Sequence, residues 1–297
     1  MFNLNKKLIL PTITSLLFAG SFVAAKYSTL DLGPLTTSLL RYLIALLFLS
    51  ILAFHRGWKS IRIEKKDILS HVMLGLTGIV GYHYFFFTAL RYTDVANTAI
   101  INAFSPMVTG LMAAIFIKER LELKNYIGIV TAALGVLIII TKGEITSLFA
   151  LNFNLGDMLM LCSVINWVIY SLIIKKLLHK YDGYTVTYFA TCFGVILLML
   201  LATTENFASQ LNSISIVSVW SVVYMGIAAS GIGYLLYNYS IKEIGPTRTS
   251  SLVYSIVPIF VAVLAFIFFD ENITFIMIGS ICLVLAGLRL MMAGKVN

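Results

Sequence analysis

The chain has little charge for its length. Only 11% of its 297 residues are Asp, Glu, Lys or Arg, less than half of the roughly 25% found in soluble domains. Hydrophobic residues make up 60% of the chain, and a soluble globule could not bury so much apolar surface without exposing large patches. The composition also excludes disordered, collagen-like, coiled-coil and disulfide-scaffold chains. A protein with many membrane crossings remains.

Cysteine is also scarce, and it gives no sign of a disulfide or a metal site. Cys162, Cys192 and Cys282 all lie within apolar stretches, and we interpret them as small core residues. Neither an HExxH motif nor a phosphate-binding loop occurs in the sequence, which argues against a zinc protease and an ATP-driven pump. We therefore predict no metal-binding residues.

Apolar runs long enough to cross a bilayer recur along the chain. A membrane-spanning helix needs about 20 residues, and these runs are continuous, unlike the alternating strands of a β-barrel. The predicted spans are residues 8–26, 34–54, 68–90, 94–117, 123–141, 155–174, 184–203, 216–239, 246–268 and 274–293. The sequence thus predicts an all-α membrane protein with ten transmembrane helices.

Positive charge is unevenly divided between the two sides of this predicted topology. With the N-terminus inside, 17 of the 21 lysines and arginines fall in inner segments and three in outer segments, and Arg41 falls within the second span. Because basic residues mark the cytoplasmic side, we predict a cell-membrane protein with both termini in the cytoplasm. The net charge of +8 then reflects topology, and we predict no nucleic-acid partner.

An internal repeat becomes visible when the sequence is shifted by 152 residues. The matched pairs are Gly81 and Gly233, Tyr82 and Tyr234, Pro106 and Pro258, Phe116 and Phe268, Glu119 and Glu271, and Gly135 and Gly287. Earlier spans align less cleanly, with Ser21–Phe22 against Asn166–Trp167. We predict two repeats, residues 1–145 and 146–297. Because each has five spans, the second is inverted, which is typical of alternating-access transporters with a site between the repeats.

The motifs in these repeats resemble a known family. They are Ala89–Asn97, Ser105-Pro106, Glu119-Arg120-Leu121, Gly128 and Gly135 in the first half, and Pro258, Glu271-Asn272-Ile273 and Gly287 in the second. Together with Leu40-Arg41-Tyr42 and Gly156-Asp157, they resemble the EamA domain of the drug/metabolite transporter superfamily, although Ala19 stands where Trp is usual. The resemblance implies a ten-helix carrier of amino acids or other small organic solutes, without a cofactor or a covalent step.

Polar and aromatic residues that lie deep in the predicted helices are candidates for a site. Tyr82 and Phe86 share one helical face, as do Tyr234 and Asn238, and the repeat relates the two pairs. Helix packing is the alternative interpretation of each residue. The candidate substrate-binding residues are Tyr82, His83, Phe86, Asn102, Ser105, Asn166, Trp167, Tyr170, Tyr234, Asn238 and Tyr254.

The prolines and charged residues inside or near the spans allow predictions about helix kinks and ion coupling. Pro106 and Pro258 each remove a backbone hydrogen bond in mid-helix, and we predict kinks or hinges there. We interpret Arg41 as a structural residue, with attraction of a substrate carboxylate as the alternative. All 13 acids lie at span ends or in loops, which favours facilitated diffusion or weak ion coupling, and His83 is the one deep group that titrates near pH 7.

The sequence as a whole predicts a secondary transporter, an exporter of small organic metabolites such as amino acids, and no enzymatic activity. Its expected partners are a small-molecule substrate and the lipid bilayer, and a monomer is compatible with the sequence. One alternative is a membrane-embedded enzyme acting on a lipid or isoprenoid substrate, which would need clustered acids, histidines or metal ligands. Another is a non-transporting membrane sensor, which would not explain an inverted repeat.

Overall fold

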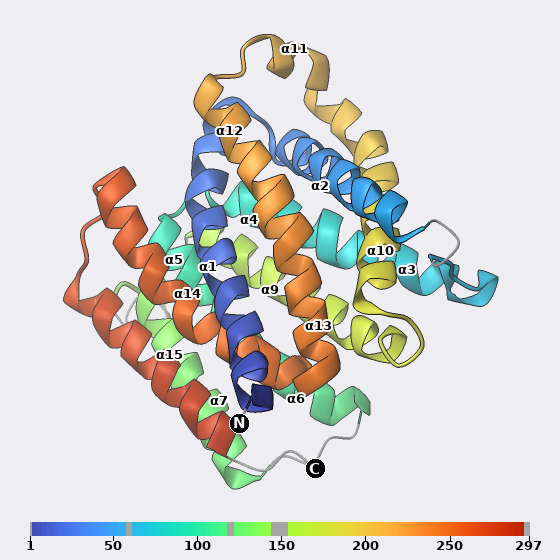
Figure 1. The fold of residues 1–297 in the computed structure, drawn as a ribbon. Helices are drawn as coiled ribbons and strands as arrows, with labels where there is room; N and C mark the ends of the chain where they lie inside the picture. The colour runs from blue at the N-terminus through green and yellow to red at the C-terminus, as the bar shows by residue number, and fades with distance from the viewer. Residues whose placement is uncertain (1, 58–60, 118–121, 144–153, 294–297) are drawn as a thin grey trace.

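The computed structural model describes residues 2–57, 61–117, 122–143 and 154–293 of the chain. These ranges are almost entirely helical and contain no strand (Figure 1). The membrane crossings are α1 (Phe2–Asp31), α2 (Pro34–Arg56), α3–η3–α4 (Ile68–Leu74, Gly75–Gly81, Tyr82–Ala89), α5–α6 (Val95–Asn102, Ser105–Ile117), α7 (Leu123–Ile140), α9 (Leu155–Leu177), α10 (Gly183–Ala202), α12–η5–α13 (Ile216–Tyr224, Met225–Gly233, Tyr234–Ile244), α14 (Pro246–Phe269) and α15 (Phe275–Ala293). Short helical turns η2 (Lys65–Asp67) and η4 (Thr203–Glu205) and helix α11 (Phe207–Asn212) lie in the connections.

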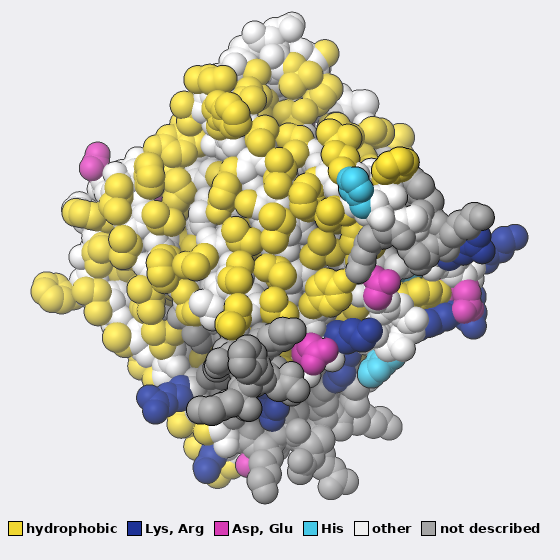
Figure 2. Space-filling model, viewed as in Figure 1, with side chains coloured by type: hydrophobic (Ala, Val, Ile, Leu, Met, Phe, Trp, Pro, Cys, Tyr) yellow, Lys and Arg dark blue, Asp and Glu magenta, His cyan; other side chains and the backbone are white. Residues whose placement is uncertain are grey.

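The prediction of an all-α membrane protein with ten spans is confirmed. Nine of the described helices are long and apolar enough to cross a bilayer, and α15 adds a shorter apolar helix. Apolar side chains cover most of the face shown in Figure 2, and many are large and exposed, such as Phe54 and Leu200. An apolar surface of this extent fits a bilayer and not water. The predicted boundary between residues 145 and 146 and the motif Glu119-Arg120-Leu121 lie outside the described residues.

The fourth crossing is broken near its middle, where the sequence predicts a single helix over residues 94–117. Helix α5 ends at Asn102, and α6 begins at Ser105. The break immediately precedes Pro106, which cannot donate a backbone hydrogen bond and whose ring would collide with the carbonyl one turn back. The matching Pro258 lies inside α14, which continues through it to Phe269. The two related prolines therefore have different effects on their helices.

Two crossings contain π-helical segments, η3 (Gly75–Gly81) and η5 (Met225–Gly233), which we call the π segments. A shift of 152 residues places residues 75–81 on 227–233, so the two segments are related by the internal repeat. Each ends in a glycine that is followed directly by a tyrosine, Tyr82 or Tyr234. Because π-helical turns are rare and often occur at functional sites, they direct attention to these tyrosines.

The two helices that end the predicted repeats, α7 and α15, lie at one side of the other eight crossings (Figure 1). Helix α1 contacts α14 and α12, α4 contacts α9, and α10 contacts α2. Helices α7 and α15 pack against each other along their length at the lower left of Figure 1. Their contact joins the last helix of each predicted repeat.

Glycine allows α7 and α15 to approach closely. A Cβ atom on Gly287 would lie 2.5 Å from the carbonyl oxygen of Gly128, and one on Gly135 would lie 2.8 Å from the carbonyl oxygen of Ser280. Gly135 and Gly287 are matched by the repeat, so each helix presents the same residue to its partner. Small residues at such crossings are a general device for packing helices in membranes.

Replacing Gly287 with alanine is expected to lower the free energy of unfolding by about 1–3 kcal/mol, because the backbone of α7 cannot move away cheaply. Gly279 in the same helix has open space at its Cβ position, so Gly279→Ala should change stability by less than about 0.5 kcal/mol. Denaturation of the purified proteins in detergent, followed by circular dichroism, compares them. Equal stability of the two variants would contradict a tight α7–α15 crossing.

Candidate functional site

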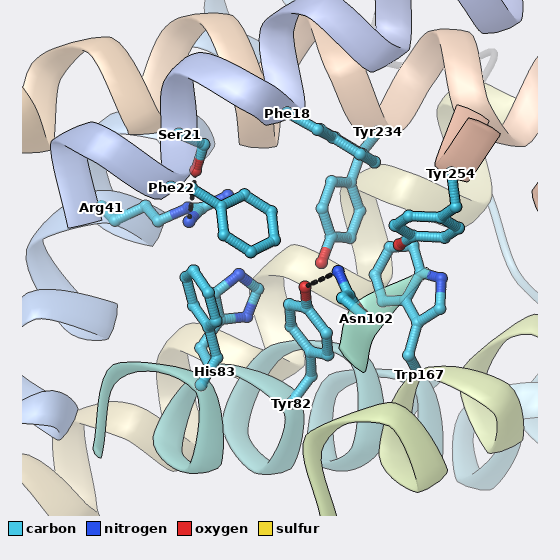
Figure 3. A pocket seen from close by; sticks show the side chains of 11 residues that line it. Phe18, Ser21, Phe22, Arg41, Tyr82, His83, Asn102, Trp167, Tyr234 and Tyr254 are labelled. Atoms are coloured by element: carbon cyan, nitrogen blue, oxygen red, sulfur yellow. Dashed lines mark hydrogen bonds between the residues drawn. The ribbon is translucent and has the colours of Figure 1, made fainter. Parts of the chain in front are cut away.

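A cavity lies at the centre of the helices. Its lining residues are Phe18, Ser21 and Phe22 of α1, Arg41 of α2, Tyr82, His83 and Phe86 of α4, Asn102 of α5, Trp167 of α9, Tyr234 of α13 and Tyr254 of α14 (Figure 3). Both halves of the chain therefore contribute to the lining. The centre of a water molecule can move within about 20 Å³ of this space, which is room for little more than one water. A solute the size of an amino acid would require the lining side chains to move.

Aromatic rings form most of the wall. The ring of Trp167 lies 4.9 Å from that of Tyr82 and 5.4 Å from that of Tyr234, measured between centroids. Phe22 and Phe86 meet edge to face at 4.9 Å. These distances are in the range of favourable aromatic pairs. The wall therefore suits a solute with an apolar or aromatic part.

Hydrogen bonds hold the polar side chains of the first half in place. The amide nitrogen of Asn102 donates to the hydroxyl of Tyr82 at 3.1 Å (Figure 3). The hydroxyl of Ser105 in turn donates to the backbone carbonyl of Asn102 at 2.6 Å, which satisfies a carbonyl next to the α5–α6 break. From α9, the hydroxyl of Ser163 donates to the backbone carbonyl of Tyr82 at 2.8 Å.

A second polar network lies behind Trp167. Its indole nitrogen donates to the hydroxyl of Tyr237 at 3.2 Å, and that hydroxyl lies 2.7 Å from the hydroxyl of Ser250. Nearby, the amide nitrogen of Asn238 lies 3.3 Å from the hydroxyl of Tyr170. The polar groups of this network are thus partnered, as groups in hydrocarbon have to be.

His83 has both ring nitrogens near hydrogen-bonding partners. Nδ1 lies 3.1 Å from the backbone carbonyl of Ile79, so a hydrogen bond there requires the proton on Nδ1. The hydroxyl of Tyr42 lies 3.3–3.4 Å from the two ring nitrogens. The histidine is 1% exposed, and it connects α4 with α2 at one end of the cavity.

Arg41 is buried beside the cavity, with neutral partners. Its Nε donates to the hydroxyl of Ser230 at 2.6 Å, and Nη1 lies 3.2 Å from the hydroxyl of Ser21 and 3.6 Å from the sulfur of Met225. Within the part of the chain that the structure describes, no carboxylate lies within 4 Å of the guanidinium. Burying a cation in this way, without a counter-charge, costs free energy.

The two π segments each supply an acceptor at repeat-related positions. The hydroxyl of Tyr234 donates to the carbonyl oxygen of Gly78 in η3 at 3.1 Å, and Ser230 in η5 accepts from Arg41. Positions 78 and 230 are 152 residues apart. Each widened turn therefore holds a residue that lines the cavity, Tyr234 at η3 and Arg41 at η5.

Polar links join the two halves at both ends of the bundle. At one end, Lys180 lies 2.5 Å from Asp67 and 2.6 Å from Glu64, and the hydroxyl of Tyr181 donates to Asp67 at 2.6 Å. At the other end, the hydroxyl of Thr93 donates to Asp157 at 2.7 Å. Asp157 lies at a span end, as predicted for all acids, but it is only 1% exposed, because its helix begins against the loop that follows α4.

The groups of the Lys180–Glu64 ion pair change their charge only outside the neutral pH range. Hydrogen bonds from Lys180 and then Lys66 hold the pKa of the Glu64 carboxyl below its usual value. Desolvation lowers the pKa of Lys180, but its hydrogen bonds with Asp67, Glu64 and Tyr181 outweigh that effect, so the net pKa is raised. Both groups are therefore charged across neutral pH.

The structure brings most of the candidate residues together. Tyr82, His83, Phe86, Asn102, Trp167, Tyr234 and Tyr254 line the cavity. Ser105, Tyr170 and Asn238 are buried behind it and partner lining residues or their neighbours, while Asn166 donates to the carbonyl of Cys162 in its own helix. The sequence analysis missed Phe18, Ser21 and Phe22. A signal existed for the last two, since they align with Asn166 and Trp167.

Comparison with known proteins identifies relatives of this chain in sequence and in fold. The model of the EamA-like transporter family matches residues 5–141 and again 154–293. A protein named "Uncharacterized transporter YyaM" from Bacillus subtilis is 29% identical over 273 residues, covering 91% of this chain and 88% of that protein. A "Probable terminal-alkyne amino-acid exporter" from Streptantibioticus cattleyicolor is 23% identical over 270 residues, covering 90% and 87%.

A solved crystal structure agrees in fold. It superposes with a TM-score of 0.68 and covers 96% of both chains, at 18% sequence identity. The family model accounts for nearly the whole sequence in two copies. This chain belongs to the EamA-like transporter family.

Proposed function

We propose that this protein is a secondary transporter that exports small organic metabolites, with amino acids among the candidates, by alternating access between two inverted repeats. The observation that carries the proposal is the central cavity, to which both halves of the chain contribute. In inverted-repeat transporters the substrate site lies between the repeats near the midplane. The name of the Streptantibioticus relative supports amino-acid export as a starting point.

The orientation we propose places both termini in the cytoplasm, in the cell membrane. It rests on the excess of basic residues in inner segments. On the face shown in Figure 2, lysine and arginine side chains lie along the lower margin and the right corner, away from the apolar middle. The lower margin is also where the N-terminus lies in Figure 1.

The links at the two ends suggest what alternating access has to break. The Lys180–Asp67 contact would close the cytoplasmic side, and the Thr93–Asp157 hydrogen bond would close the outer side. Both are formed here, around a cavity with almost no free space. Opening toward one side would separate one link and keep the other. This scheme requires neither a cofactor nor a covalent step.

Efflux from proteoliposomes tests the proposal. Vesicles loaded with labelled amino acids, or with other small organic solutes, should lose them faster when they contain the protein. Tyr82→Ala should slow this efflux about tenfold or more, because the loss of about 1.4 kcal/mol of solute binding corresponds to a factor of ten. Tyr84→Ala is the matched control, since Tyr84 lies in the same helix but is 38% exposed.

The outcomes separate the possibilities. If no solute moves and none binds, the proposed function fails. If Tyr84→Ala slows efflux as much as Tyr82→Ala, the loss reflects the helix in general and not the cavity. A pH gradient that drives uphill uptake would contradict facilitated diffusion, and Asp157, as a buried acid, would then be the first group to replace.

A further inference from the structure

The guanidinium of Arg41 is the one fully charged group among the residues that line the cavity. Serine hydroxyls and a thioether are its polar contacts in the described structure, and they involve Nε and Nη1. No partner of Nη2 is found among the described residues. An arginine fork matches a carboxylate with two parallel hydrogen bonds. The arginine is therefore held in place by neutral groups and retains capacity for an anion.

Close packing of α2 against η5 does not by itself require an arginine at position 41. Helix α2 packs on η5 so closely that a Cβ on Gly226 would lie 2.8 Å from the carbonyl oxygen of Arg41. Helix α10 packs on η3 in the same manner, and a Cβ on Gly75 would lie 3.1 Å from the carbonyl oxygen of Ala190. The residue whose carbonyl approaches η3 at that contact is an alanine. Since this type of helix contact forms without a cation, the charge is a specific property of one side of the cavity.

We infer that Arg41 receives the carboxylate of the transported solute, and that this solute is an organic monoanion with an apolar or aromatic body and without an ammonium group. The inference rests on the proposed transport function and narrows its substrate class, because it leaves amino acids, which carry an ammonium group, out of the candidates. No Asp or Glu occurs among the lining residues. An ammonium group taken into this apolar space would therefore lack a counter-charge, which is unfavourable.

The side chains that line the rest of the cavity suit the body of such a solute chemically, once they move apart to admit it. Figure 3 shows Arg41 at one end of the view and Trp167 with Tyr254 at the other, with Tyr82 and Asn102 between them. A carboxylate at the arginine would direct the remainder of the molecule along aromatic faces. Their flat apolar surfaces favour a ring or a branched chain over a second charged group.

Basic side chains at one end of the bundle are compatible with an anionic solute. A hollow of about 210 Å³ between the ends of α9 and α13 is lined by Lys175, His179 and Lys242, together with Leu178, Ile241 and Gly245. No acid is among these residues. On the proposed topology this hollow faces the cytoplasm, and basic side chains there would raise the local concentration of anions. Export would begin at this side.

Four probes that share one phenyl ring test the inference: 3-phenylpropanoate, its neutral amide 3-phenylpropanamide, phenylalanine and phenethylamine. Binding to the full-length protein in detergent is measured by calorimetry. We expect 3-phenylpropanoate to bind most tightly, phenylalanine at least about tenfold more weakly, and phenethylamine most weakly. Arg41→Gln should reduce the affinity for 3-phenylpropanoate roughly 10- to 100-fold, the worth of a hydrogen bond to a charged group, and leave that for the amide unchanged.

Arg41→Lys keeps the charge without the fork. This variant should retain more of the affinity for 3-phenylpropanoate than Arg41→Gln does. Its affinity for the amide should equal that of the natural protein. It also serves as the test variant if the Arg41→Gln protein does not fold. Equal loss of acid and amide in the variants would overturn the inference, as would tighter binding of phenylalanine or phenethylamine by the natural protein. If none of the four probes binds but other solutes still leave proteoliposomes, the substrate class is wrong and the transport function stands. If no solute binds or moves, both are wrong.

Discussion

Replacing Gly78 with alanine is expected to reduce solute efflux at least about tenfold and to lower the free energy of unfolding by about 1–3 kcal/mol. The added Cβ would lie 2.2 Å from Cδ2 and 2.7 Å from Cγ of Tyr170. That ring cannot move aside, because it is fully buried, stacks on Trp167 at 5.2 Å and bonds to Asn238. The π segment would therefore have to move away from α9.

The displacement would reach the cavity through two contacts. The carbonyl oxygen of Gly78 accepts a hydrogen bond from the hydroxyl of Tyr234. Tyr82 is the residue that directly follows the π segment η3. Both tyrosines line the cavity. A shift of η3 would thus move a wall of the site as well as strain the helix contact, so transport and stability should fall together.

Gly183→Ala is the matched control for a buried glycine. Its added Cβ would meet Asn238 and Tyr239 at 3.6 Å, an ordinary contact distance, and Gly183 is the first residue of α10. We expect this variant to unfold within about 0.5 kcal/mol of the natural protein and to transport normally. Efflux assays and denaturation in detergent measure both effects. If Gly78→Ala behaves like Gly183→Ala, η3 is not fixed against α9 as described.

The ten spans could be predicted because lipid imposes simple rules on sequence. A crossing helix has to be apolar over about 20 residues, and the two prolines matched by the repeat were visible without a structure. The π segments could not be predicted in this way. Their glycines, such as Gly75, Gly78 and Gly81, indicate close packing, but the widened turns depend on partners elsewhere in the chain, including Tyr234.

The site was predictable to the extent that polarity distinguishes a residue from its surroundings. Tyr82, Asn102 and Trp167 stand out because they lie deep in apolar helices, and all three line the cavity. Phe18 and Phe22 do not stand out in an apolar run, since a phenylalanine facing lipid and one facing a cavity look alike in sequence. Only the packed arrangement of helices distinguishes the two directions.

Trp167→Ala is expected to have the largest effect on stability of any single cavity substitution. Trp167 is 1% exposed, and its ring lies 4.9 Å from Tyr82, 5.1 Å from Tyr237 and 5.4 Å from Tyr234. Truncation of a buried aromatic residue to alanine typically costs about 3–5 kcal/mol, because a cavity remains where the ring was. Denaturation in detergent should therefore show a large loss.

Two further variants separate the contributions of this side chain. Trp167→Phe keeps a ring but removes the N–H that donates to Tyr237 at 3.2 Å, so we expect an intermediate loss of stability. Trp220 in α12 is 66% exposed, and Trp220→Ala should cost less than about 0.5 kcal/mol. If Trp220→Ala and Trp167→Ala lose equal stability, the lipid-facing tryptophan contributes as much to the free energy of unfolding as the tryptophan of the central aromatic wall. The order Trp220→Ala, Trp167→Phe, Trp167→Ala would instead place the main stabilising contacts in the wall that also forms the proposed site.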